Sequence, residues 1–115
     1  MTDLELLNER CKETFNSLDL PFAYRIEKVD EIIHLPYVRY WFSGERLTGS
    51  DSRTGIRSLT LNVELISDRK RFDLENSIEE AFHEFEATKS EDFDTTDEVF
   101  IETFTFDVIQ KIRRN

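Results

Sequence analysis

The sequence predicts an α+β fold, a mostly antiparallel sheet of four to five strands with two helices packed on it. Its length of 115 residues accommodates one domain, so residues 1–115 are expected to fold as a single domain. Apolar side chains recur every three or four residues in two segments and alternate in others, the patterns of amphipathic helices and half-buried strands. The predicted order is helix, strand, strand, long loop, strand, helix, strand, and short links between strands favour antiparallel pairing.

The first predicted element is a helix at residues 3–18, and a sheet-and-helix body follows at residues 21–112. Pro21 ends the helix. The only cysteine, Cys11, lies in the apolar stripe of the helix and is interpreted as a small buried hydrophobe, in preference to a redox or nucleophilic group. The stripe consists of Leu4, Leu7, Cys11, Phe15 and Leu18.

Three strands are predicted in the middle of the chain. Residues 22–26 alternate, residues 37–42 are aromatic and β-branched, and residues 59–65 place four apolar side chains on one face. Residues 43–55 hold all three glycines and no aromatic residue, so they are predicted to form a long connecting loop. Loops of this length are usually functional or disordered.

A second helix is predicted to begin at Asp73, which can cap it. Burying each large apolar side chain of its inner face stabilises the helix by roughly 1.5–3 kcal/mol. That outweighs a cost of about 0.2–0.5 kcal/mol for each like-charge pair on its outer face. Residues 89–98 are predicted to form a polar connection before a final strand that contains Phe100, Phe104, Phe106 and Val108. The acidic residues assigned to the outer face are Glu75, Glu79, Glu80, Glu84 and Glu86.

The formal net charge of −10 is confined to one stretch of the chain. Residues 73–98 hold 11 acidic side chains and one basic side chain, and the other residues are balanced. Such a protein is a poor candidate for a general phosphate-binding surface, because lysine and arginine supply that affinity. No apolar run approaches the roughly 20 residues that span a bilayer, and the first residues lack a signal-peptide pattern. Cytoplasmic synthesis without membrane attachment is therefore expected.

The residues give no catalytic signal, and we expect no enzyme activity, cofactor or bound metal. The sequence has no glycine-rich phosphate loop, no CxxC and no HExxH, and neither His34 nor His83 lies in a nucleophile motif. His83 with Glu79, Glu80 and Glu86 could offer metal ligands, but a solvated acidic helix face is the favoured interpretation. Residues 91–98 lack the residue order and the glycine of a calcium loop.

Glu102 shares a strand face with aromatic side chains, and a half-buried carboxylate needs a partner. Arg39 or Arg57 on a neighbouring strand could supply one. A structural ion pair of Glu102 with Arg39 is the favoured interpretation, ahead of a role as general acid or base.

The succession of motifs resembles a known family. The motifs are Phe22-Ala23-Tyr24, Leu35 to Tyr40, a loop with Ser43, Gly44, Gly49, Ser50 and Asp51, the strand Leu61 to Leu65 closing on Ser67 to Lys70, Asp73 to Glu79, and Phe100 to Val108. In this order they are similar to the tail-terminator (tail-completion, minor tail) proteins of long-tailed phages, over roughly residues 20–112.

The resemblance implies a structural protein that forms a ring, typically of six copies, on the end of the tail tube. Its expected partners are further copies of itself, the major tail tube protein and the head–tail connector, with DNA only as passing cargo. Its expected location is the host cytoplasm during assembly and then the virion tail. A head-side neck protein of similar size, and an acidic inhibitor or DNA mimic that occupies a basic nucleic-acid site, are the alternatives.

Opposite charges on two sides of one subunit would favour head-to-tail contact in such a ring. Some of the acidic residues could instead line the lumen and repel the phosphates of passing DNA. The predicted basic set is Arg46, Arg53, Arg57, Arg69, Lys70 and Arg71, and the predicted acidic set is Glu75, Glu79, Glu80 and Glu84.

Overall fold

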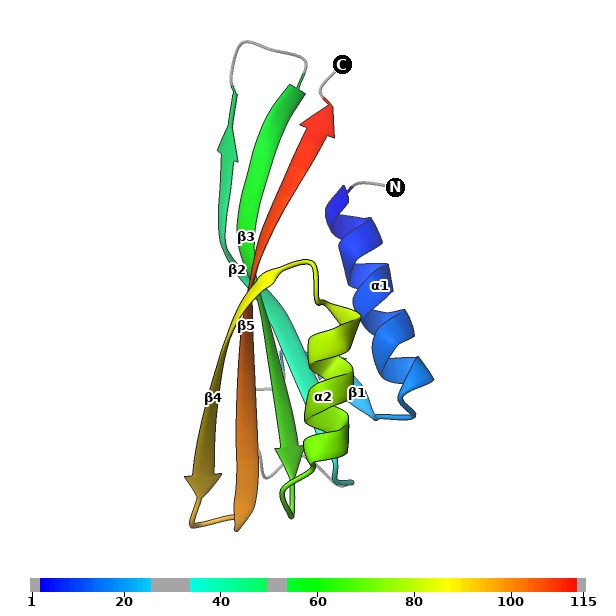
Figure 1. The fold of residues 1–115 in the computed structure, drawn as a ribbon, viewed down its shortest axis with the longest axis vertical. Helices are drawn as coiled ribbons and strands as arrows, with labels where there is room; N and C mark the ends of the chain where they lie inside the picture. The colour runs from blue at the N-terminus through cyan, green and yellow to red at the C-terminus, as the bar shows by residue number, and fades with distance from the viewer. Residues whose placement is uncertain (1–2, 26–33, 50–53, 114–115) are drawn as a thin grey trace.

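The computed structural model describes residues 3–25, 34–49 and 54–113, which form two helices and a five-stranded sheet (Figure 1). The strand order is β1-β2-β3-β5-β4, with β1 and β2 parallel and the other neighbours antiparallel, so the predicted α+β class is confirmed. The elements are α1 (Asp3–Ser17), β1 (Phe22–Tyr24), β2 (Tyr37–Thr48), β3 (Thr54–Ser67), α2 (Phe72–Ala81), β4 (Glu86–Asp94) and β5 (Val99–Arg113).

Both helices pack on the same face of the sheet, which we call the helix face; the opposite side is the outer face (Figure 1). Alternation along β3 and β5 explains the arrangement, because the side chains of every second residue point to the helix face. Phe15 of α1 lies at the centre of the core, with its ring 5.4 Å from that of Tyr40 and 6.5 Å from that of Phe82. The same core cluster includes Leu7, Cys11, Val38, Leu61, Val63, Leu65, Ile78, Phe104, Phe106 and Val108.

The molecule is elongated, 51 × 25 × 24 Å, because β2, β3 and β5 continue past the helices as a narrow three-stranded arm (Figure 1). We define the arm as residues 43–49, 54–58 and 109–113. The prediction of a loop at residues 43–55 is therefore wrong for its described part, where β2 runs to Thr48 and β3 begins at Thr54; residues 50–53 lie outside the described residues. The arm lacks alternation of apolar residues because no helix covers it, and backbone pairing holds it together.

The polar connection predicted at residues 89–98 is also largely wrong, because residues 86–94 form the edge strand β4, and only residues 95–98 make the turn to β5. Most side chains of β4 are exposed, so the strand has no apolar pattern to reveal it. Its stability comes from a ladder of nine paired residues with β5.

Helix α2 begins at Phe72, and its N-cap is Arg71, two residues before the predicted cap Asp73, with no side-chain cap. Asp73 lies in the first turn, where its carboxylate pairs with Arg71 instead of capping the helix. The prediction that Glu75 lies on the solvent-exposed face of the helix is wrong, since this residue is 3% exposed. Helix α2 ends at Ala81, so Glu84 and Glu86 lie beyond it.

Replacement of Phe15 with alanine is expected to lower the free energy of unfolding by about 3–5 kcal/mol, because it leaves a cavity among packed rings. Urea denaturation followed by circular dichroism measures this change as a shift in midpoint. Leu6→Ala on the same helix is the control: Leu6 is 54% exposed, and its loss should change stability by no more than about 0.5 kcal/mol. Equal effects of the two substitutions would contradict the packing described here.

Candidate functional site

Lys70 joins three elements of the fold at the base of α2. Its ammonium Nζ lies 2.9 Å from Glu75 Oε2 of α2 and 3.0 Å from Glu102 Oε2 of β5, and it also bonds Glu91 of β4. The side chains of Glu75 and Glu102 are only 4% and 5% exposed. Two carboxylates are thus buried against one partly buried ammonium, which makes Lys70 a structural crosslink.

Lys89 of β4 extends this cluster. Its Nζ lies 3.4 Å from Glu75 Oε1 and 2.8 Å from Glu79 Oε1. We call the set Lys70, Lys89, Glu75, Glu79, Glu91 and Glu102 the acidic network. Burial raises the pKa of Glu102 despite the hydrogen bond from Lys70. Burial works to lower the pKa of Lys70, but hydrogen bonds to Glu91, Glu75 and Glu102 together raise it.

The predicted ion pair of Glu102 with Arg39 is wrong, although Glu102 is buried and ion-paired as expected. Glu102 is opposite Leu65 in the β3–β5 register, and therefore its side chain points to the helix face, where Lys70 reaches it. Arg39 is opposite Glu64, and the two form an ion pair on the outer face. Thr103 donates a hydrogen bond of 3.1 Å to the same glutamate. The sheet separates the predicted partners.

Several residues of the predicted basic and acidic sets have partners within the chain. Besides the acidic network, Arg57 Nε lies 3.2 Å from Glu45, Arg71 lies 3.1 Å from Asp73, and Glu84 lies 2.7 Å from Arg10. Arg10 holds the pKa of Glu84 below its usual value, mainly through this hydrogen bond. Within the described residues, Arg46, Arg69 and Glu80 of the predicted sets make no ion pair, and Arg53 lies outside those residues.

The described part of the chain contains no group of three or more histidine, cysteine or acidic side chains arranged to bind a metal. His83 is exposed, and its ring Nδ1 lies 3.0 Å from the carbonyl oxygen of Glu80. Cys11 is fully buried, and burial raises the pKa of its thiol to about 12. Such a thiol is almost wholly protonated near neutral pH and is a weak nucleophile.

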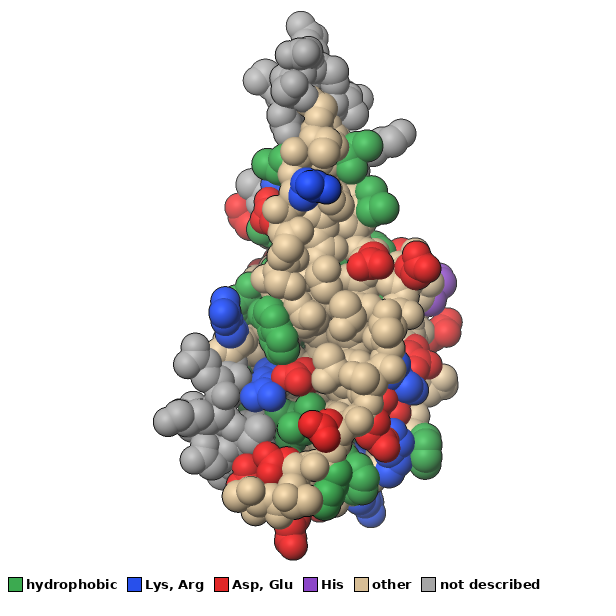
Figure 2. Space-filling view, turned by 90° about the vertical axis from the view of Figure 1, so that its left-hand side faces the viewer, with side chains coloured by type: hydrophobic (Ala, Val, Ile, Leu, Met, Phe, Trp, Pro, Cys, Tyr) green, Lys and Arg blue, Asp and Glu red, His purple; other side chains and the backbone are tan. Residues whose placement is uncertain are grey.

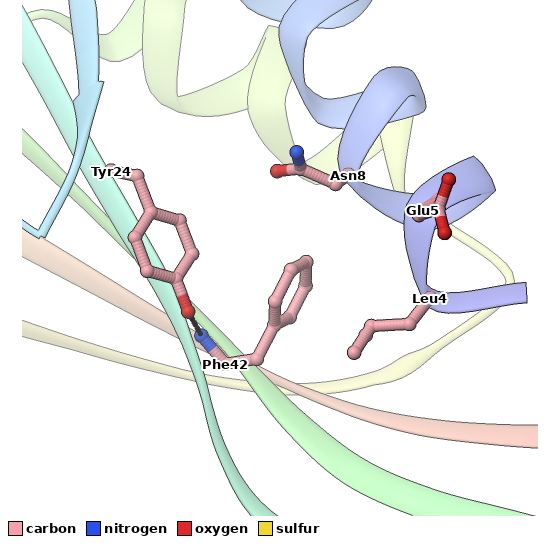
Figure 3. A pocket seen from close by; sticks show the side chains of 5 residues that line it. All are labelled: Leu4, Glu5, Asn8, Tyr24 and Phe42. Atoms are coloured by element: carbon pink, nitrogen blue, oxygen red, sulfur yellow. Dashed lines mark hydrogen bonds between the residues drawn. The ribbon is translucent and has the colours of Figure 1, made fainter. Parts of the chain in front are cut away.

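An open cleft of about 460 Å³ lies between the first turns of α1 and the strands β1 and β2 (Figure 3). Leu4, Glu5 and Asn8 line it from the helix, and Tyr24 and Phe42 from the strands. The Tyr24 hydroxyl accepts a hydrogen bond of 3.2 Å from the backbone N–H of Phe42. The titratable groups of its lining are the carboxylate of Glu5 and the hydroxyl of Tyr24.

The features that sequence reasoning missed are the arm and the strand edges. Pairing of β1 with β2 ends at Tyr24 and Tyr40, so residues 43–48 have no neighbouring strand on that side among the described residues. Strand β4 pairs only with β5 and forms the opposite edge of the sheet. The arm also exposes Leu47, Ile56 and Ile109, at 51%, 44% and 70%. The wide spacing of their positions in the sequence gives no signal that they share one projection.

Comparison of the sequence with protein-family models and with curated proteins gives no match. Within the described residues, neither helix has the length and apolar character that a membrane span requires.

Replacement of Lys70 with methionine is expected to lower the free energy of unfolding by about 3–5 kcal/mol at pH 7, because it leaves the buried carboxylate of Glu102 without its ammonium and Glu75 with Lys89 alone. Without Lys70, the folded-state pKa of Glu102 lies still further above its unfolded value of 4.5. The folded variant then binds more protons than the unfolded chain, and so the stability gap to the wild type should narrow as the pH falls from 7 toward 4.5. Urea denaturation at several pH values measures both effects.

Lys12→Met is the matched control, because Lys12 pairs with Glu9 on the surface of α1. Its effect should stay within about 0.5 kcal/mol at every pH. Adding Glu102→Met to Lys70→Met removes one stranded carboxylate and should recover part of the loss. A loss that does not depend on pH would contradict the crosslink.

Cys11 is expected to react with a thiol reagent such as dithionitrobenzoate only after the chain unfolds, because its side chain is buried and protonated. Colour release in native buffer should be slow, because only the small population of opened molecules exposes the thiol, and urea should accelerate it. Rapid stoichiometric labelling of the folded protein would contradict the burial.

Proposed function

We propose that the protein is a structural subunit of a phage or prophage tail that assembles into a ring on the tail tube, ends tube growth and joins the tail to the head connector. The observation that carries this proposal is the arm. A narrow three-stranded projection with three exposed aliphatic side chains is costly for an isolated subunit and useful in an assembly. The resemblance of the motifs to tail-terminator proteins supports the same assignment.

The two ends of the molecule also differ in charge, as head-to-tail contacts favour. The arm carries Arg46 and Arg57, with Glu45 as the only acidic residue in its described strands. The rest of the molecule carries the acidic residues of α2, β4 and the turn at residues 95–98, which outnumber the basic residues Arg69, Lys70, Arg71 and Lys89 beside them. In Figure 2, most of the acidic side chains lie over the wide half of the molecule, with basic side chains among them, and the tapering half above it shows basic and apolar side chains with one acidic group at its side. The acidic residues that stay exposed in a ring would repel the phosphates of passing DNA.

The rival function, a DNA mimic, fits the charge distribution less well. A mimic presents exposed carboxylates to a basic site, whereas Glu75 and Glu102 are buried against Lys70. Glu79 and Glu84 are also neutralised, by Lys89 and Arg10 respectively. The acidic network therefore acts largely within the subunit, and the proposal of an assembly protein accounts for more of the molecule.

The test mixes the purified protein with polymerising tail-tube protein and measures tube lengths by electron microscopy. Termination predicts shorter tubes with a ring at one end, and a length that falls as more protein is added. Leu47→Asp on the arm should weaken this effect, because it places a charge on a contact side chain. Leu6→Asp, a similarly exposed position on α1, is the matched control.

Tubes that grow without limit in the presence of the protein would refute termination. Binding to the head connector without any effect on tubes would instead indicate a head-side neck protein. Inhibition of a nuclease or of another DNA-binding protein would support the mimic.

A further inference from the structure

Two strand edges in this subunit have no partner strand among the described residues. On β2, the hydrogen bond from Phe42 N–H to the Tyr24 hydroxyl marks the end of pairing with β1, and the edge at residues 43–48 lies beyond it. On β4, the edge runs the whole length of the strand, because β5 lies on the other side. A β-bulge between Ser43 and Arg46 interrupts the β2 edge, whereas the β4 edge is regular. Unpaired edges accept an added strand, and on β2 the segment that continues regularly beyond the bulge begins at Arg46.

The β2 edge carries a basic side chain on the outer face. Arg46 pairs with Ser58 in the β2–β3 register, and Ser58 points away from the core side chain of Leu59 next to it. Within the described residues, Arg46 forms no ion pair, whereas the helix-face Arg57 of the same arm contacts Glu45. Arg46 is therefore the charge that the arm presents beside this edge.

The β4 edge carries acidic side chains on the same outer face. Glu86 and Asp92 are opposite Asp107 and Ile101 of β5, residues that alternate with the core positions Phe106 and Glu102. Glu86 and Asp107 form a like-charge pair across the strands, which is unfavourable. No ion pair of Glu86, Asp92 or Asp107 is formed within the described part of the chain.

The helix-face charges of β4 are already satisfied. Lys89 binds Glu75 and Glu79, and Glu91 binds Lys70. The charges that remain available along β4 are therefore acidic and lie on one face. They are complementary to Arg46, which lies on the corresponding face of the other edge.

We propose that residues 43–48 of one copy pair with β4 of the next copy, so that the sheet continues across the subunit boundary and Arg46 lies on the same face as Glu86 and Asp92 of the neighbour. The inference rests on the proposed function in taking a second copy of this chain as the partner. The two edges are different surfaces, and their pairing is head to tail, the arrangement that can close into a ring.

Charge selects this pairing over the symmetric ones. Two β4 edges brought together would oppose acidic residues, and two β2 edges would oppose one Arg46 to another, whereas the mixed pair brings unlike charges together. The edges also lie in different halves of the long axis, that of β2 in the arm and that of β4 beside the packed body (Figure 1). One copy can therefore offer both edges at once to two different neighbours.

The experiment measures association by sedimentation velocity over a concentration series for the wild type, Arg46→Glu, and the double variant Glu86→Lys/Asp92→Lys. Each variant alone brings like charges together, and we expect its association to weaken by about tenfold or more. An equimolar mixture of the two variants restores unlike charges at every contact of an alternating ring. The mixture is therefore expected to regain the wild-type assembly.

Matched controls make the same charge changes away from the edges, in Arg69→Glu and in Glu13→Lys/Glu80→Lys, and should associate like the wild type. Hydrogen exchange of the wild type provides a second measurement that needs no variant: amides of residues 43–48 and of β4 should gain protection as assembly proceeds. A wild type that stays monomeric throughout, a mixture that fails to recover, equal loss in the controls, or protection of β4 alone would each overturn the proposal.

Association and tube termination are separate measurements. Recovery in the mixture without any effect on tubes would leave the edge pairing intact and refute the proposed function. Tube termination by a wild type that shows no protection at these edges would refute the edge pairing and leave the proposed function intact.

Discussion

The rest of the structure depends on the pairing of β3 with β5. Their register runs without a shift from Ser67 and Phe100 at one end to Thr54 and Arg113 at the other. The lower part of this ladder carries the core positions Val63 and Phe104, against which the helices pack. The upper part carries the arm. Because the same two strands build both halves, the arm is held in a fixed direction relative to the packed body, as the proposed assembly contacts would require.

The fold class could be predicted because burial leaves a periodic signature in the sequence. The alternation of Leu59, Leu61, Val63 and Leu65, and the helical spacing around Phe15, both point to one apolar face and correspond to the observed core. The arm and β4 could not be predicted in this way. Both are held by backbone hydrogen bonds and are largely exposed, so any polar side chain suits them and the pattern resembles a loop.

The candidate site was predicted in part, and the errors have a common cause. Burial and pairing of Glu102 follow from its position among aromatic residues. Its partner depends on which face of the sheet Glu102 occupies and on which side chain of the turn between β3 and α2 reaches that face. Lys70 stands in a run of three basic residues and looks like a surface charge. Only the fold shows that this turn aims it at two carboxylates from different elements. Lys70 and Glu102 are 32 residues apart, so no local sequence pattern indicates that they pair.

The hydroxyl of Tyr24 has a consequence for how far the sheet can grow. It occupies the backbone N–H of Phe42 where β1 ends, and thereby limits the open edge of β2 to a short segment. Bare strand edges are templates for indiscriminate strand addition, and a β-bulge between Ser43 and Arg46 interrupts the regular run of this one. The tyrosine and the bulge together shorten the surface along which a second chain can stack on β2.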